Sequence, residues 1–125
     1  MGLSYTKEDY VNKIKNDINK FIPIAKHYER CEEYFKHINF TLQSEFYNKA
    51  IELNPNNSVS YYNRGIAKSK LQNYTEGIAD YNLAITLNPK YAEAFYNRGL
   101  TKYYILKDKD GACLDWSKAG ELGES

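Results

Sequence analysis

Two asparagines, Asn63 and Asn97, stand 34 residues apart, and each follows a tyrosine, Tyr62 or Tyr96. A primary amide offers two N–H donors and one carbonyl acceptor, which are the groups that pair with a peptide backbone. Tyrosine supplies a large contact area at low entropic cost and is enriched at protein interfaces. The two pairs therefore fit the recognition of an extended peptide. An equally good interpretation is that the amides belong to the framework of the fold and bond neighbouring segments.

Other residues could in principle carry metal or catalytic chemistry. His27 and Cys31 are four residues apart, which places both on one face of a predicted helix. Two ligands do not make a site, and neither His37 nor Cys113 is spaced to complete one, so a small buried thiol is the better interpretation of Cys31. The chain has no Gly-rich phosphate loop, no G-x-S-x-G and no catalytic carboxylate pair. We expect no enzyme, no metal and no cofactor.

The composition limits the classes of partner. The 125 residues include 17 basic and 16 acidic side chains, interspersed, and the formal net charge is +1. Such a balance does not favour nucleic acid or an anionic membrane. The two cysteines lack C-x-x-C spacing, which is typical of a reducing compartment, and no apolar run approaches the roughly 18 residues of a membrane span. We expect a cytoplasmic protein with a protein or peptide partner.

The spacing of the apolar residues predicts helices along the whole chain. Thr6 is a suitable N-cap for an amphipathic helix over 7–22, which Pro23 ends. Asn39 and the Asn-Pro pairs after Leu53 and Leu87 mark later breaks. Further helices are expected at about 24–37, 41–53, 59–71, 74–87, 92–106 and 110–122.

These elements recur as a unit of 34 residues. Tyr61-Tyr62-Asn63-Arg64-Gly65 returns as Phe95-Tyr96-Asn97-Arg98-Gly99, and Leu53-Asn54-Pro55 returns as Leu87-Asn88-Pro89. Self-similarity of this period is the signature of a helical solenoid. The sequence therefore predicts one all-α domain built from stacked helix pairs.

At these positions the chain resembles the tetratricopeptide repeat family, whose unit is a helix-turn-helix of this length. Small residues in the family let the two helices approach closely, while aromatic residues fill the space where they diverge. The resemblance implies a right-handed superhelical stack of about seven helices. It is closest over 58–91, where the family's positions are occupied by Tyr61, Gly65, Gly77, Tyr81, Ala84 and Pro89.

The resemblance also divides the chain. In the first unit Cys31 replaces glycine and Gln43 replaces a small residue, so this unit is degenerate; in the third unit Ala112, Trp116 and Ala119 come one residue late, and the turn 107–110 absorbs the insertion. The expected segments are an N-terminal helix at 1–23, which caps the array or lies across a groove, and three units at 24–57, 58–91 and 92–125.

In the family, the first helices of successive units line a concave groove. The resemblance therefore implies a binding surface, whereas Tyr61, Tyr74, Tyr81 and Phe95 are assigned to packing and Asp80 and Asp115 to the solvated back. The implied groove residues are Val59, Tyr62, Asn63, Ile66, Ser69, Lys70, Glu93, Tyr96, Asn97, Leu100, Tyr103 and Tyr104.

One subgroup of the family binds acidic chaperone C-termini through Lys, Arg and Asn in this groove. Asn63 matches one of those positions, but the others hold Tyr28, Glu32, Glu93 and Asn97, so the cations that would hold a carboxylate are missing. With Lys70 as the main opposing charge, the groove suits a neutral or weakly basic peptide better.

The sequence thus predicts a non-catalytic protein-protein interaction module that binds a peptide or helix in the concave groove. An alternative of another class is structural self-assembly, a homodimer through the uncapped last unit and the N-terminal helix. A remote alternative is a regulatory domain that acts only within a larger assembly.

Overall fold

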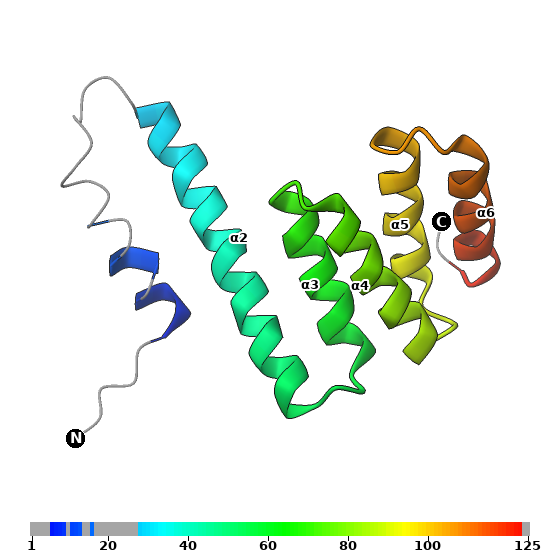
Figure 1. The fold of residues 1–125 in the computed structure, drawn as a ribbon, viewed down its shortest axis with the longest axis horizontal. Helices are drawn as coiled ribbons and strands as arrows, with labels where there is room; N and C mark the ends of the chain where they lie inside the picture. Colours follow the sequence, from blue (N-terminus) through cyan, green and yellow to red (C-terminus); the bar gives the residue numbers. More distant parts are fainter. Residues whose placement is uncertain (1–5, 10, 14–15, 17–27, 124–125) are drawn as a thin grey trace.

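The computed structural model describes residues 6–9, 11–13, 16 and 28–123 of the chain. Over these residues the structure is helical and contains no strand, which confirms the all-α prediction. Five helices with their bounds follow one another side by side (Figure 1): α2 (Tyr28–Leu53), α3 (Ser58–Lys70), α4 (Tyr74–Leu87), α5 (Ala92–Tyr104) and α6 (Lys109–Glu121). The short stretches 7–9 and 11–13 are also helical.

Side-chain caps fix the start of several helices. The Thr6 backbone N–H donates to Asp9 Oδ2 at 2.9 Å, and the Asp9 N–H donates to Thr6 Oγ1 at 3.1 Å. This reciprocal pair confirms Thr6 as a cap, and the bond from the Thr6 backbone, followed by that from its hydroxyl, lowers the pKa of Asp9. Asn57 Oδ1 accepts from Val59 N at the start of α3, and Asp108 Oδ1 accepts from Gly111 N at the start of α6.

The predicted break at Asn39 is wrong. From Tyr28 onward the two helices expected at 24–37 and 41–53 are one continuous helix, α2. In the turn after α3, Gln72 adopts a left-handed φ of 66°; the residue 34 positions earlier is Ile38, whose β-branched side chain disfavours that conformation. A single asparagine costs only a fraction of a kcal/mol in a helix, and Thr41 Oγ1 donates to the His37 carbonyl within the continuous helix.

Helices α3 and α4 pair closely, as do α5 and α6, because glycine stands at each crossing. A Cβ atom added to Gly65 would lie 2.8 Å from the Tyr81 ring and 3.1 Å from the carbonyl oxygen of Gly77. A Cβ atom added to Gly99 would lie 2.6 Å from Nε1 of Trp116. The packing roles expected for these glycines and for Tyr81, which is buried, are confirmed.

The third helix pair keeps these contacts despite its extra residue. Only 71–73 separate α3 from α4, whereas 105–108 separate α5 from α6. The insertion therefore lies entirely in the turn, where Lys107 has a left-handed φ of 57°. Trp116 takes the place of Tyr81 beside the glycine, and Asp115 takes that of Asp80.

Two buried ion pairs correct the expectation that Asp80 and Asp115 lie on the solvated back. Asp80 is only 2% exposed and Asp115 only 4%. Arg64 donates to Asp80 through Nε at 2.8 Å and Nη2 at 2.7 Å, and Arg98 donates to Asp115 through the same atoms at 2.9 and 2.7 Å. These hydrogen bonds raise the pKa of Arg64 above its ordinary value. The cross-helix pairing considered for both arginines is confirmed.

Each arginine also reaches the preceding helix. Arg64 Nη1 donates to Asn48 Oδ1 of α2 at 3.0 Å, and Arg98 Nη1 donates to Asn82 Oδ1 of α4 at 2.8 Å. One guanidinium therefore ties three successive helices together. The same arrangement recurs at both places because all its members follow the repeat.

Replacing Gly65 with leucine should lower the free energy of unfolding by about 1 to 3 kcal/mol or more, because the side chain would overlap the Tyr81 ring. Gly120→Leu is the matched control, since this glycine of α6 has open space around its Cβ position. Urea unfolding followed by circular dichroism measures both. Equal losses would contradict a role for the glycine crossing.

Asp115→Ala should destabilise the fold by about 3 to 5 kcal/mol, because it leaves the Arg98 guanidinium, only 18% exposed, without its carboxylate. Asp110→Ala, an exposed change in the first turn of the same helix, should cost no more than about 1 kcal/mol. The double change Arg98→Met with Asp115→Leu should recover most of the loss. If Asp115→Ala behaves like Asp110→Ala, the buried pair does not hold the helices.

Candidate peptide-binding surface

A hollow of about 370 Å³ lies between α3 and α5. It brings together four of the residues predicted for the groove, together with Ser69 from the wider set. The four are Ile66, Lys70, Asn97 and Leu100. The other predicted residues do not line this hollow: Val59, Tyr62, Asn63, Glu93, Tyr96, Tyr103 and Tyr104.

Asn97 is part of the framework and also faces the hollow. Its Nδ2 donates to Tyr62 Oη at 2.8 Å and to the Glu93 carbonyl at 3.0 Å. An amide nitrogen has two protons, so both are used within the protein. The carbonyl oxygen Oδ1 is left to accept from a ligand. Asn97 therefore favours an N–H donor in a partner and cannot donate to one without breaking an internal bond.

Asn63, at the equivalent position in the preceding repeat, is in a different situation. It is half-buried, and its side chain makes no hydrogen bond to the described part of the chain. Its amide keeps both donor and acceptor capacity. The two asparagines are therefore not two identical members of a ladder.

Tyr62 joins the two repeats. Its ring centroid lies 4.8 Å from that of Tyr91 and 6.0 Å from that of Tyr81, in addition to the bond that its hydroxyl accepts from Asn97. Burial is the main reason that the pKa values of Tyr81 and Tyr91 are raised. Tyr62 thus belongs more to packing than to an open groove.

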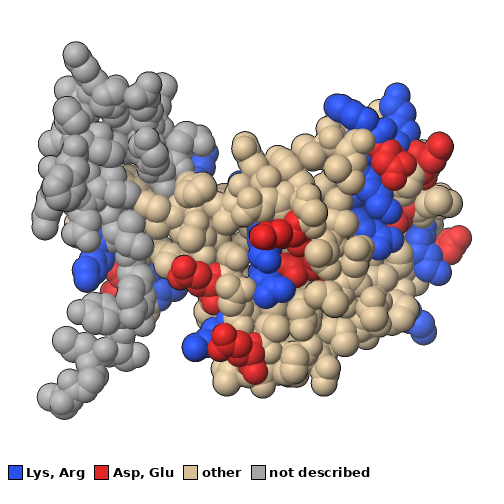
Figure 2. Space-filling view, viewed as in Figure 1, with Lys and Arg blue, Asp and Glu red and all other residues tan. Residues whose placement is uncertain are grey.

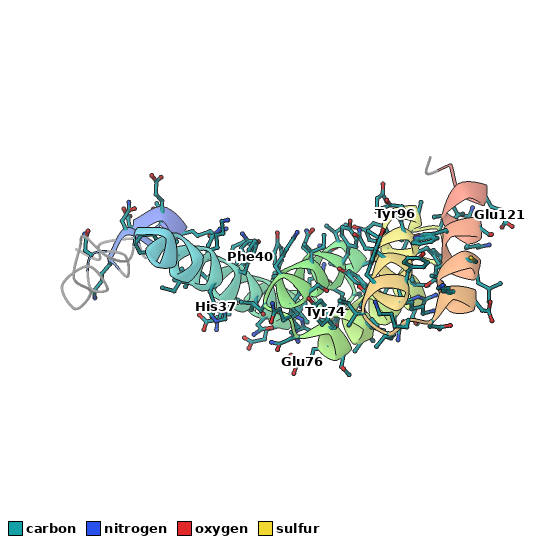
Figure 3. The ribbon with its side chains drawn as sticks, turned by 90° about the horizontal axis from the view of Figure 1, so that it is seen from above. His37, Phe40, Tyr74, Glu76, Tyr96 and Glu121 are labelled. Carbon is teal, nitrogen blue, oxygen red and sulfur yellow. The ribbon has the colours of Figure 1, made fainter. Side chains whose placement is uncertain are left out.

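Tyr96, at the equivalent position in the next repeat, is 40% exposed. Seen from above, it lies at one edge of the stack, opposite Glu76 of α4 (Figure 3). No described residue stands to Tyr96 as Asn97 stands to Tyr62. Its carbonyl, by contrast, accepts from Trp116 Nε1 at 3.3 Å.

Tyr103 explains why the hollow does not repeat. It stands 34 positions after Ser69, and its ring packs 5.4 Å from Trp116 and 4.9 Å from Tyr104, measured between centroids. A ring therefore fills the place that a small hydroxyl leaves open in the preceding repeat. Tyr104 lies at the exposed edge of this cluster.

The base of the hollow is polar, which the sequence did not predict. Ser69 Oγ and Tyr81 Oη are 3.4 Å apart, and because burial raises the pKa of Tyr81 its hydroxyl stays protonated. Thr101 and Ile105 also line the hollow. They follow Asn97 at steps of four, so helical spacing from Asn97 could have identified them.

The charges near the hollow are few. Lys68 pairs with Glu76 and Asp80, whereas Lys70 is exposed and makes no ion pair with any described residue. Glu93 is exposed beside Asn97. On the face drawn in Figure 2 most of the surface over α3 and α4 is uncharged, and Lys and Arg side chains gather at the α5–α6 end.

The remaining chemistry predicted from the sequence is only partly open to inspection. The His27 and Cys31 side chains lie outside what the structure describes. In the described part, no group of three His, Cys, Asp or Glu side chains could hold a metal ion, and Cys113 is an exposed free thiol. None of the described helices is both long and apolar enough to cross a bilayer.

The different bonding of the two asparagines predicts different effects on stability. Asn97→Ala should lower the free energy of unfolding by about 1 kcal/mol, because it removes the bond to Tyr62. Asn63→Ala should stay within about 0.5 kcal/mol. Chemical unfolding of the two variants under one condition checks this, and a larger loss for Asn63→Ala would reverse the assignment.

Comparison with known proteins supports the repeat. Residues 46–79 match a family model described as "Tetratricopeptide repeat", and residues 67–105 match one described as "TPR repeat". The human small glutamine-rich tetratricopeptide repeat-containing protein beta is 35% identical over 78 residues, covering 60% of this chain and 25% of the human protein. The protein of that name from Rattus norvegicus is 36% identical over 65 residues, covering 52% and 20%. The chain spans about a quarter of the length of these relatives.

The matched residues are those that form the helix pairs. They include the glycine crossing of α3 and α4 and the first helix of the next pair, α5. Repeats of this kind are non-catalytic modules with protein partners. The chain belongs to the tetratricopeptide repeat family.

Proposed function

We propose that this chain is a non-catalytic interaction module that binds an extended peptide of another protein across α3 and α5. The observation that carries the proposal is the hollow of about 370 Å³ beside Asn97, whose Oδ1 is free to accept. A peptide backbone N–H is a suitable donor for that oxygen. We also propose a cytoplasmic location and no catalytic activity.

The walls of the hollow favour a partner side chain with an apolar body. Ile66, Leu100 and Ile105 supply aliphatic surface, and the hydroxyls of Ser69 and Tyr81 lie at the base. Each hydroxyl has one proton and they can use only one between them, so another remains to donate. A side chain with an apolar stem and an acceptor at its tip matches this arrangement.

The charges favour a neutral or weakly basic backbone segment over an acidic one. Glu93 and the Asn97 oxygen are both acceptors, and Lys70 is the nearby cation at the hollow. One exposed ammonium contributes little to holding a carboxylate. An acidic peptide would also meet the Glu93 charge.

The binding site can be tested before the natural partner is identified. A library of 12-residue peptides displayed on phage is selected on the intact chain, and one selected peptide is labelled and titrated by fluorescence anisotropy. Leu100→Asp should weaken binding at least tenfold, because it puts a charge into the apolar wall. Leu83→Asp, at an exposed position of α4 that does not line the hollow, is the matched control and should leave affinity unchanged.

Two results would contradict the proposal. Equal affinity of Leu100→Asp and wild-type protein, with both folded by circular dichroism, would place binding elsewhere. A selected set dominated by Asp and Glu would contradict the preferred charge. Asn63→Ala separates backbone recognition from wall contacts, since its stability effect is expected to be small.

Self-association is a second candidate, and one observation favours it. A face of α2 that is buried in the other repeats is uncovered. The interface would therefore be α2, and not the last unit with the N-terminal helix as the sequence suggested.

A further inference from the structure

One face of α2 lacks the cover that the same positions have in both later helix pairs. In α4, the four residues that face α3 are Gly77, Asp80, Tyr81 and Ala84, and all are buried. The residues 34 positions earlier are Gln43, Phe46, Tyr47 and Ala50 of α2. Phe46 is 60% exposed, and the other three are only half-buried.

The same chain shows what belongs on that face. In both complete pairs it is covered by a first helix that carries arginine followed by glycine, Arg64-Gly65 on α4 and Arg98-Gly99 on α6. At the same offset, the first half of α2 carries Arg30 followed by Cys31, also a small residue. Residues 28–38 are therefore the chain's own covering helix for residues 41–53.

Within one molecule the two halves cannot meet while α2 is continuous. Cys31 and Gln43 are 12 residues apart in one helix, a separation of about 18 Å along its axis at 1.5 Å per residue. The contacting side of α2 is also not the side that faces α3, because Asn48, which bonds Arg64, points about 150° away on the helical wheel from the middle of the uncovered face.

We infer that the uncovered face of α2 is a dimer interface, on which residues 28–38 of a second copy pack against residues 41–53 of the first, and the reverse. Gly65 lies against Gly77 and Tyr81 in the complete pair. Transferred by 34 positions, Cys31 of one copy lies against Gln43 and Tyr47 of the other. These pairs are centred on positions 37 and 39, so a twofold axis passes near Ile38 of two antiparallel α2 helices.

Ile38 is also the reason that the exchange is intermolecular. It occupies the position of Gln72, whose left-handed φ of 66° lets α4 fold back on α3. Because isoleucine resists that conformation, the helix continues and its first half is presented to a second molecule. This is the relation between a closed hairpin and a domain-swapped dimer.

The short helical stretches at 7–9 and 11–13 lie beside the same stripe of α2, around Phe35, Lys36 and Asn39. A hollow of about 450 Å³ separates them from α2, so the two segments are not close-packed. Pairing of two α2 helices requires this contact to open, and the stripe from Gln43 onward is left unobstructed by it.

A disulfide tests the arrangement directly. The full chain carries Gln43→Cys in a Cys113→Ser background and is oxidised with copper phenanthroline, then analysed by non-reducing gel electrophoresis and peptide mass mapping. We expect a covalent dimer joined by Cys31 of one copy and the new cysteine of the other. Glu45→Cys, on the opposite side of α2, is the matched control and should give at least tenfold less of it.

Every other result overturns the inference. An intramolecular disulfide would show that the first repeat closes as a hairpin in solution. Absence of any disulfide from Gln43→Cys, with Cys31 still reactive to a thiol reagent, would show that another occupant or none covers the face. An equal yield from both cysteine positions would show random collision.

The hinge supplies a second measurement. Ile38→Gly permits the left-handed turn, so light scattering over a dilution series should change from dimer to monomer, and the disulfide of Gln43→Cys should become intramolecular. Ile38→Leu, which keeps the helix, should leave both readouts unchanged. A strictly monomeric wild-type chain over the whole dilution series would overturn the dimer. Peptide binding through α3 and α5 does not enter either readout, so it stands or falls separately.

Discussion

The buried pairing of arginine with aspartate is the interaction on which the rest of the stack depends. A guanidinium that is held on two edges by Asp80 or Asp115 has a fixed plane, and its remaining nitrogen is then aimed at one asparagine of the previous helix. A buried charge is tolerated only when it is paired in this way. The pairs therefore fix both the rotation within a helix pair and the position of the next pair. The side chains that reach the hollow between α3 and α5 follow from that rotation.

Loss of the same interaction accounts for the first repeat. Phe46 stands where the later repeats have aspartate, so no carboxylate is available to a preceding arginine. Without the ion pair and without a residue suited to the turn, closing a hairpin gains less than continuing the helix. Degeneracy in the sequence has a structural result here, which is a longer helix with a face that its own chain does not cover.

The period of the sequence was sufficient to predict the helices from α3 onward, the glycine crossings and the tyrosine under Gly65, because these depend on contacts within one repeat. Asp80 was misplaced because a lone carboxylate in a helix is usually solvated, and its partner lies sixteen residues away on another helix. The inequality of Asn63 and Asn97 could not be predicted either. It arises from Tyr62, a residue of the neighbouring repeat, and a strict repeat treats the two amides as equal. The continuous α2 was foreseeable only by asking which residue must adopt a left-handed φ.

The extra residue between α5 and α6 shows where the array tolerates a change in length. A residue added to the turn leaves Trp116 and Asp115 on the side that meets Gly99 and Arg98. A residue added inside α6 would rotate everything after it by about 100° and turn the carboxylate away from its arginine. Spacing between repeat motifs is therefore free to drift in the turns and fixed within the helices. A loop or reporter segment can be spliced between Leu106 and Lys107 while the stacked helices keep their register.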